Sequence, residues 1–149
     1  MPNKPIKEMR ALSVTQPWAE CIVSEGKNIE NRSWNTKLRG YIAIHASTSF
    51  SRDRFDHCAE NYGLDFDKDD VPYGVIVGFA KLVDVVTEED VTHETKKWFE
   101  GDYGFVLDDV IKLKKPVVVK GTLSFWKLKG KTLNSCLSQL TEAQKKKLL

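Results

Sequence analysis

The chain has 149 residues, of which 41% are hydrophobic and 30% charged, and its formal net charge is +2. This length suits a single domain over residues 1–149 whose core needs neither disulfides nor a metal ion to fold. No segment approaches the roughly 20 apolar residues of a membrane span, and the N-terminus lacks the apolar core of a signal peptide, so we expect a cytoplasmic protein without a membrane partner.

The first predicted elements are a strand and a helix. Residues 11–15 alternate as a short strand. The helix that follows has Pro17 at its first position and Gly26 just past its end. The helix start carries Gln16 and Trp18, and its free backbone N–H groups are a ready anion site. Trp18 either packs in the core or serves as a stacking platform.

The next strand, 28-NIENRSW-34, is preceded by Lys27 and combines opposite charges with a tryptophan. Period two places Glu30, Arg32 and Trp34 on one face. The charges form either a surface ion pair worth roughly 0–1 kcal/mol, or a site in which Lys27 and Arg32 hold a phosphate or a base edge while Glu30 orients them.

A strand over 41–47 carries Tyr41 and His45 on one face, and an amphipathic helix follows over 51–62. His45 is the one histidine inside a predicted strand. A lone histidine is usually a structural hydrogen-bonding group, and the alternative is a catalytic base.

The second half of the chain predicts mostly strands. The strongest is 75–86, in which Gly78 indicates a bulge or a close approach of another backbone. Thr141 and Gln144 have the spacing of a capping box that begins a final helix, whose last residues, 145–149, are expected to fray. The other predicted elements are a short helix over 88–97, a strand over 103–110, and a long strand over 116–128 that can bend at Gly121.

Five or six strands joined by loops and brief helices predict a mixed α+β domain around a small, curved, barrel-like sheet. Residues 1–9 are expected to be a loose lead-in. A monomer is the default expectation.

Charged residues are unevenly distributed along the chain. Residues 112–131 hold seven lysines and no acid, whereas residues 65–70 hold four aspartates and one lysine. The lysines form either a patch that attracts phosphates or a solvated strand pair that keeps the protein soluble. Basic residues recur beside Trp34, Trp98 and Trp126, which is typical of single-stranded nucleic-acid binding, although tryptophans also fill small cores.

The three cysteines, Cys21, Cys58 and Cys136, are an odd number without a CxxC pair. This pattern argues against a disulfide framework or a zinc site, so we expect buried, reduced thiols. No phosphate-binding, dinucleotide-binding or nucleophile-elbow motif occurs, and the sequence predicts no metal and no cofactor.

Six stretches of the chain, taken together and in order, resemble a known family. They are 12-LSVTQPWAE-20, 26-GKNIENRSW-34, 39-RGYIAIHAS-47, 72-PYGVIVGFAKLVD-84, 98-WFEGDYGFVL-107 and 116-PVVVKGTLSFWKL-128. They resemble ASCH domains of the PUA-like superfamily, in particular the small single-domain bacterial, viral and EOLA-like branch. The resemblance covers roughly residues 10–130. It implies a PUA-like mixed β-barrel of about five or six strands with short helices packed around it.

The superfamily largely handles RNA, so the resemblance implies a cleft that holds a single-stranded nucleotide or a modified base. The cleft would lie between the first helix, the 26–34 segment and the strand that holds His45. The candidate ligand-binding residues are Gln16, Trp18, Lys27, Arg32, Trp34, Arg39, Tyr41, Lys120, Trp126 and Lys127, and the candidate catalytic residues are Lys27, Glu30 and His45.

Three other functions stay open. A metal-independent ribonuclease would use the 2′-hydroxyl of RNA as the nucleophile and Glu30 or His45 as the base. Lys27 or Arg32 would then face the phosphate, and Tyr41 would donate a hydrogen bond. A second possibility is a nucleoside amidohydrolase, because one branch of these domains hydrolyses the amide of N4-acetylcytidine and looks like it uses a threonine nucleophile. Glu30 occupies that position here, and a carboxylate cannot act as the hydroxyl nucleophile. The third is a protein-interaction adaptor, since related domains occur attached to transcription coactivators.

Overall fold

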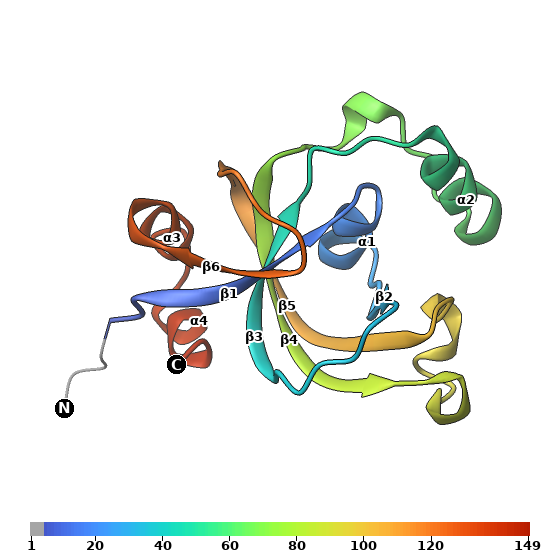
Figure 1. Cartoon of the computed structure of the whole chain (residues 1–149). Coiled ribbons are helices and arrows are strands. Elements are labelled where there is room, and N and C mark those ends of the chain that lie inside the picture. The colour runs from blue at the N-terminus through green and yellow to red at the C-terminus, as the bar shows by residue number, and fades with distance from the viewer. Residues whose placement is uncertain (1–4) are drawn as a thin grey trace.

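Residues 5–149 are described by the structure, which is a computed structural model, and they form one six-stranded sheet with the order β2-β5-β4-β3-β1-β6. Only the β1–β3 pair is parallel among the described strands. The sheet curls into a half-barrel (Figure 1). Its strands are β1 (Glu8–Val14), β2 (Ile29–Arg32), β3 (Gly40–Ala46), β4 (Val75–Val86), β5 (Tyr103–Val118) and β6 (Phe125–Lys129).

Helices cover both faces of the curl. The helix α1 lies within it, whereas α3 and α4 pack together on the outside near β1 and β6 (Figure 1). The helices are α1 (Trp18–Ser24), α2 (Arg52–Tyr62), α3 (Gly130–Leu137) and α4 (Glu142–Lys147), with 3-10 turns η1 (Lys68–Asp70), η2 (Glu88–Asp90) and η3 (Lys96–Trp98). The predicted α+β, barrel-like architecture is confirmed.

Alternation along the strands divides the apolar residues between the two faces. Leu12, Ile42 and Ile44 pack with Ile22 of α1 inside the curl. Ala11, Ala43 and Phe79 point to the outer face, where α3 and α4 cover them. The three cysteines are free and buried, as expected.

Side chains close the open side of the half-barrel. The Trp34 ring meets Phe105 of β5 and Phe125 of β6 edge-on, with centroid distances of 5.2 and 5.6 Å. Phe105 and Phe125 also stack on each other at 6.2 Å. One aromatic cluster therefore joins β5 and β6, which lie far apart in the strand order.

Within the described residues, the two ends of the chain have more regular structure than the sequence predicted. The first strand begins at Glu8, so Glu8 and Met9 belong to the sheet and not to a loose lead-in, because they pair with Lys129 and Leu128 of β6. Residues 1–4 lie outside the described part of the chain. At the other end, the Thr141 capping box is confirmed, and Leu148 packs against the outer core instead of fraying.

The boundaries predicted after residue 88 were partly wrong. The expected helix over 88–97 is replaced by the two 3-10 turns η2 and η3. The two strands expected over 103–110 and 116–128 are one long strand, β5, then a turn and β6. Pro116 is tolerated inside β5 because it falls where the register with β4 shifts, between the partners of Ile76 and Gly78. The helix α3 was not predicted.

Gly78 confirms the expected close approach of two backbones. A Cβ atom at this position would lie 2.4 Å from the carbonyl oxygen of Ile111 on the neighbouring strand. No side chain fits there, so a glycine is needed for β4 and β5 to pack closely at the bulge.

Candidate functional site

A cleft of about 890 Å³ opens at one end of the half-barrel. Its walls come from the end of β1, from β2 and the residues that flank it, from the end of β3, and from the loop over 119–124 that joins β5 to β6. Seven predicted site residues line the cleft, namely Trp18, Lys27, Glu30, Arg32, Trp34, His45 and Lys120.

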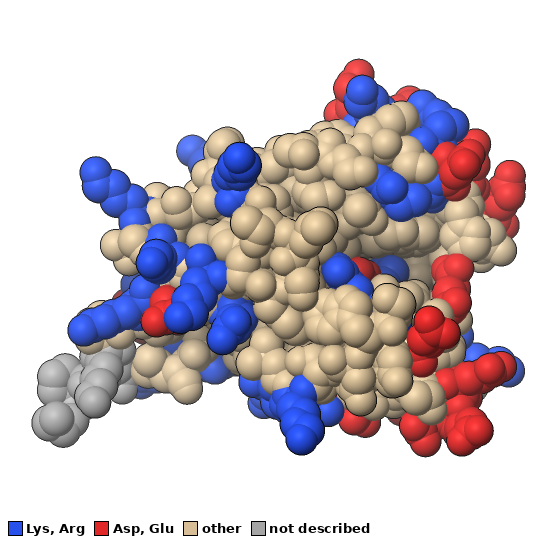
Figure 2. Space-filling view, in the orientation of Figure 1, with Lys and Arg blue, Asp and Glu red and all other residues tan. Residues whose placement is uncertain are grey.

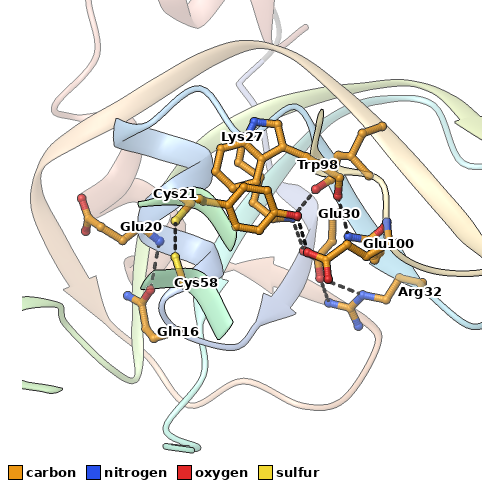
Figure 3. A network of polar contacts seen from close by, with 12 residues as sticks. Gln16, Glu20, Cys21, Lys27, Glu30, Arg32, Cys58, Trp98 and Glu100 are labelled. Atoms are coloured by element: carbon orange, nitrogen blue, oxygen red, sulfur yellow. Dashed lines mark hydrogen bonds and ion pairs between the residues drawn. The ribbon is translucent and has the colours of Figure 1, made fainter. Parts of the chain in front are cut away.

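Glu30 is the centre of a buried charge cluster in this cleft. Its Oε1 accepts from Lys27 Nζ at 3.2 Å, and its Oε2 accepts from Arg32 Nε at 3.1 Å (Figure 3). Arg32 Nη2 lies 3.0 Å from the same Oε2. One carboxylate thus serves two cations, and the cluster carries one net positive charge. The expected Glu30–Arg32 pair is present, but it is largely buried and not a surface pair.

Lys27 faces the protein and not the cleft opening. Its side chain is 3% exposed, and Nζ also donates to the backbone carbonyl of Ile29. The ammonium stands 5.6 Å from the centre of the Trp18 ring. These partners compensate the positive charge of Lys27. Its main structural role is therefore to hold the Glu30 carboxylate in place.

Arg32 is held on one side and open on the other. In addition to its contacts with Glu30, Nη2 donates to the carbonyl oxygen of Ser13 at 2.7 Å. Its guanidinium carbon lies 6.0 Å from the centre of the Trp34 ring. Nη1 has no hydrogen-bond partner within residues 5–149. The guanidinium plane is therefore fixed, with donors left for a ligand.

His45 is fixed in one neutral tautomer by its two partners. A carbonyl only accepts, so Nε2 donates to the Val119 carbonyl at 2.9 Å, and Nδ1 accepts from the Ser13 hydroxyl at 3.1 Å. Burial lowers the pKa of His45, and the hydrogen bond to Val119 opposes this only in part. Trp126 Nε1 donates to the Ser13 oxygen at 3.0 Å. Trp126 thus lies behind the cleft wall, not in it.

Glu100 is a second carboxylate of the cleft, which the sequence analysis did not single out. Asn31 of β2 positions it, because Asn31 Oδ1 accepts from the backbone N–H of Glu100 at 2.8 Å. The carboxylate contacts His57 Nε2 at 2.5 Å and accepts from the Tyr62 hydroxyl. Burial, and then this hydrogen bond, raise the pKa of Tyr62. The sequence around Glu100 gives little indication of this site, because Glu100 lies in a loop and its partners His57 and Tyr62 lie on α2.

Ser47 supplies one further polar group. Its Oγ is buried and has no hydrogen-bond partner among the described residues, and the residue lines the cleft. An unpaired buried hydroxyl costs free energy unless a ligand or water satisfies it. Together with Arg32 Nη1, it is a polar group of a cleft-lining residue that has no hydrogen-bond partner within residues 5–149.

Several predicted ligand contacts lie elsewhere. Gln16 is fully buried, and its amide donates to the Pro72 carbonyl at 2.8 Å, so it supports the loop below the cleft. Tyr41 shares a strand face with His45, as predicted, but lies roughly 13 Å further along the strand at ~3.3 Å per residue, where its hydroxyl donates to Asp109.

Arg39 and Lys127 are also outside the cleft lining. Arg39 donates to the carbonyls of Thr36 and Leu38 in its own turn. Lys127 points away on β6 and lies 3.7 Å from Glu8, with both side chains more than half exposed. The cleft therefore gathers its cations from Lys27, Arg32 and Lys120 only, within residues 5–149.

Lys and Arg are separated from most Asp and Glu across the surface (Figure 2). On the face shown in Figure 2, Lys and Arg gather on the side of β1, β6 and α3, and most Asp and Glu lie on the opposite side. No group of three or more His, Cys, Asp or Glu side chains in residues 5–149 is arranged to hold a metal ion. None of the helices described is both long enough and apolar enough to cross a membrane.

Comparisons with known proteins agree on one family. The model of the ASCH domain matches residues 12–117. The human and mouse proteins named "Activating signal cointegrator 1" are 29% and 28% identical to this chain over 133 residues, covering 80% of this chain and 22% of each relative. The chain thus spans about a fifth of the length of the curated relatives it matches.

Solved structures agree on the fold. The crystal structure of the ASCH protein from Zymomonas mobilis has a TM-score of 0.51 at 18% identity, covering 89% of this chain and 95% of that one. A serine-to-alanine mutant of that protein gives 0.51 at 17% identity, covering 87% and 94%. The likeness confirms the predicted PUA-like fold.

Proposed function

The chain belongs to the ASCH domain family, and from this premise we propose that it is an RNA-binding domain whose cleft holds one single-stranded nucleotide or a modified base. The family has a PUA-like fold and is generally associated with RNA. The observation that carries the proposal is the Arg32 guanidinium, which Glu30 and Ser13 fix in place while Nη1 stays free.

The cleft offers what a nucleotide needs. The Nη1 group of this fixed guanidinium is free to donate to a phosphate oxygen or to a base edge. The Ser47 hydroxyl is an unpaired group at a second point of the wall, and Lys120 adds a cation at the same cleft. Most of the exposed lysines in residues 112–131 lie outside the cleft. They are suited to contacts with the phosphates of the neighbouring nucleotides in the same RNA strand.

Binding of a fluorescently labelled single-stranded RNA, followed by anisotropy in EDTA, tests the proposal. Arg32→Lys keeps the charge but loses the guanidinium that Glu30 and Ser13 hold in place with Nη1 free, so we expect at least about tenfold weaker binding. Arg39→Lys is the matched control, because Arg39 lies outside the cleft, and we expect it to bind within about twofold of wild type. Equal affinities for the two variants would contradict a site at Arg32.

A ribonuclease is the second candidate, and Glu100 favours it. Glu30 is a poor general base, because both of its oxygens accept from cations, and His45 already uses both ring nitrogens. Glu100 lines the same cleft with an imidazole and a phenol at its oxygens, so the base would be Glu100 and not the residues first predicted.

Cleavage of RNA, but not of DNA of the same sequence, in EDTA would identify this activity, because DNA lacks the 2′-hydroxyl. Glu100→Gln should then abolish cleavage and leave binding within a few-fold of wild type. Cleavage at the full rate in Glu100→Gln would exclude this base.

The other two functions have less support. The amidohydrolase would need a nucleophile in place of Glu30, whose carboxylate is occupied by Lys27 and Arg32. An adaptor role is suggested by the name of the relatives, and the chain covers only 22% of those proteins. A protein partner that stays bound to the double variant Lys27→Ala, Arg32→Ala would support the adaptor role.

A further inference from the structure

The loop over residues 119–124 carries an apolar side chain at the edge of the polar cleft. Leu123 is 92% exposed and lines the cleft. Val118, just before the loop, is 81% exposed but is not part of the lining. An exposed leucine is common on surfaces, so exposure alone says little. Leu123 differs from other exposed apolar residues because it lines the same cleft as Arg32.

The start of this loop is firmly held by side chains from three strands. His45 of β3 donates to the Val119 carbonyl at 2.9 Å, and Ser13 of β1 donates to His45 at 3.1 Å. Trp126 of β6 donates to Ser13 at 3.0 Å, and the Val119 N–H bonds the Gly74 carbonyl at 3.1 Å. Leu123 therefore does not belong to a loose tail.

Gly121 brings the middle of the loop directly onto this chain of hydrogen bonds. A Cβ atom at residue 121 would lie 2.6 Å from His45 Nδ1 and 2.8 Å from Ser13 Oγ. The Ser13–His45 spacing is that of a nucleophile and its base. However, the glycine backbone covers the pair and Trp126 already bonds the serine oxygen, so the pair acts to hold the loop.

A cleft with a fixed cation and an aliphatic side chain on an anchored loop matches the two parts of a nucleotide. The phosphate or the base edge is polar, and the base has flat faces that gain from contact with apolar groups. We infer that Leu123 covers one face of the base whose polar groups Arg32 binds, and that this contact makes the site selective for unpaired nucleotides. A base inside a duplex has both faces covered by stacking and leaves no face for the leucine.

This inference rests on the proposed function and deepens it, so its test must separate the two. Anisotropy titrations would compare a single-stranded RNA with a hairpin of equal length and charge. Leu123→Asn keeps the side-chain size and removes its apolar character, and Val118→Thr is the matched control outside the cleft. Both residues are exposed, so neither change should disturb the fold.

We expect Leu123→Asn to bind the single strand about tenfold more weakly, with unchanged binding to the hairpin stem and no change for Val118→Thr. The loss should be the same at low and moderate salt, because no charge is removed. Wild-type affinity in Leu123→Asn, or an equal loss on the hairpin, would overturn the inference while leaving RNA binding intact. No binding of single-stranded RNA by wild type would overturn the proposed function itself.

Discussion

Arg32 Nη2 donates to the backbone carbonyl of Ser13 at 2.7 Å, and this contact joins β2, one edge of the sheet, to β1 near the other edge. The same guanidinium bonds Glu30 and leaves Nη1 free at the cleft. Arg32 thus contributes to closure of the half-barrel, together with the Trp34 cluster, and carries the free donor of the proposed ligand site.

Replacing Glu30 by Gln should destabilise the fold strongly. The change removes the negative charge that compensates Lys27 and Arg32, and Lys27 is 3% exposed, so an uncompensated buried charge remains. We expect a loss of about 3 kcal/mol in the free energy of unfolding, measured by urea denaturation.

The control for this variant is Glu142→Gln. Glu142 is 87% exposed and pairs only with Lys145 three residues on. We expect a change within about 0.5 kcal/mol for it. A loss of that small size in Glu30→Gln would mean that the charge cluster is solvated and not a buried unit.

Acid should weaken the fold through His45. Burial lowers its pKa in the folded protein below the ordinary value of 6.5, so between the two values the unfolded chain binds more protons and stability rises with pH. The contribution is fully present above pH 6.5 and is lost as the pH falls through the folded pKa. Urea midpoints between pH 7.5 and pH 4.5 should show this loss.

His45→Gln should remove that part of the pH dependence, whereas His93→Gln, at an exposed position, should leave it unchanged. Parallel curves for wild type and His45→Gln would show that His45 titrates normally. The hydrogen bonds to Ser13 and Val119 would then not fix its tautomer.

Gly121→Ala should displace the loop from the Ser13–His45 pair. The added methyl group would lie 2.6 to 2.8 Å from these side chains, closer than atoms approach without movement. We expect a loss of about 1–3 kcal/mol in stability together with weaker RNA binding. Thr122→Ala, at an exposed position of the same loop, is the control for stability. Unchanged stability in Gly121→Ala would show that the loop is not packed on the pair.

Salt dependence should distinguish the lysines of residues 112–131. Lys120 lines the cleft, whereas Lys127 lies beside Glu8 on β6. We expect Lys120→Ala to lower the slope of log Kd against log salt by about 0.7, the value for one phosphate of a single strand. Lys127→Ala should lower the slope by less, because Lys127 lies outside the cleft lining and 3.7 Å from Glu8. Equal slopes for wild type and Lys120→Ala would argue against a phosphate contact there.

Local sequence pattern determined much of the fold because strands and helices follow from periodicity. Alternation placed Glu30 and Arg32 on one face of β2, and their contact at 3.1 Å agrees with it. The same rule placed Tyr41 and His45 on one face. It does not say whether two residues on that face lie close enough along the strand to share a site. Tyr41 was therefore assigned to the cleft wrongly.

Contacts between distant segments could not be predicted in this way. Ser13 contacts Trp126 across 113 positions of sequence, and Asn31 contacts Glu100 across 69. Strand pairing brings such residues together, since β1 pairs with β6 and β2 pairs with β5. The loop at Gly121 was read as a bend in a strand for the same reason, since a glycine signals a close approach without naming the partner.

The most direct test of the central claim is an NMR titration of the isotopically labelled protein with a short single-stranded RNA, following the arginine Nε–Hε signals and the leucine methyl groups. A ligand at Arg32 and Leu123 predicts that these two side chains shift together and saturate at one RNA concentration, while Arg39 barely moves. Shifts confined to the exposed lysine face, with Arg32 and Leu123 unchanged at saturation, would contradict a nucleotide site in this cleft.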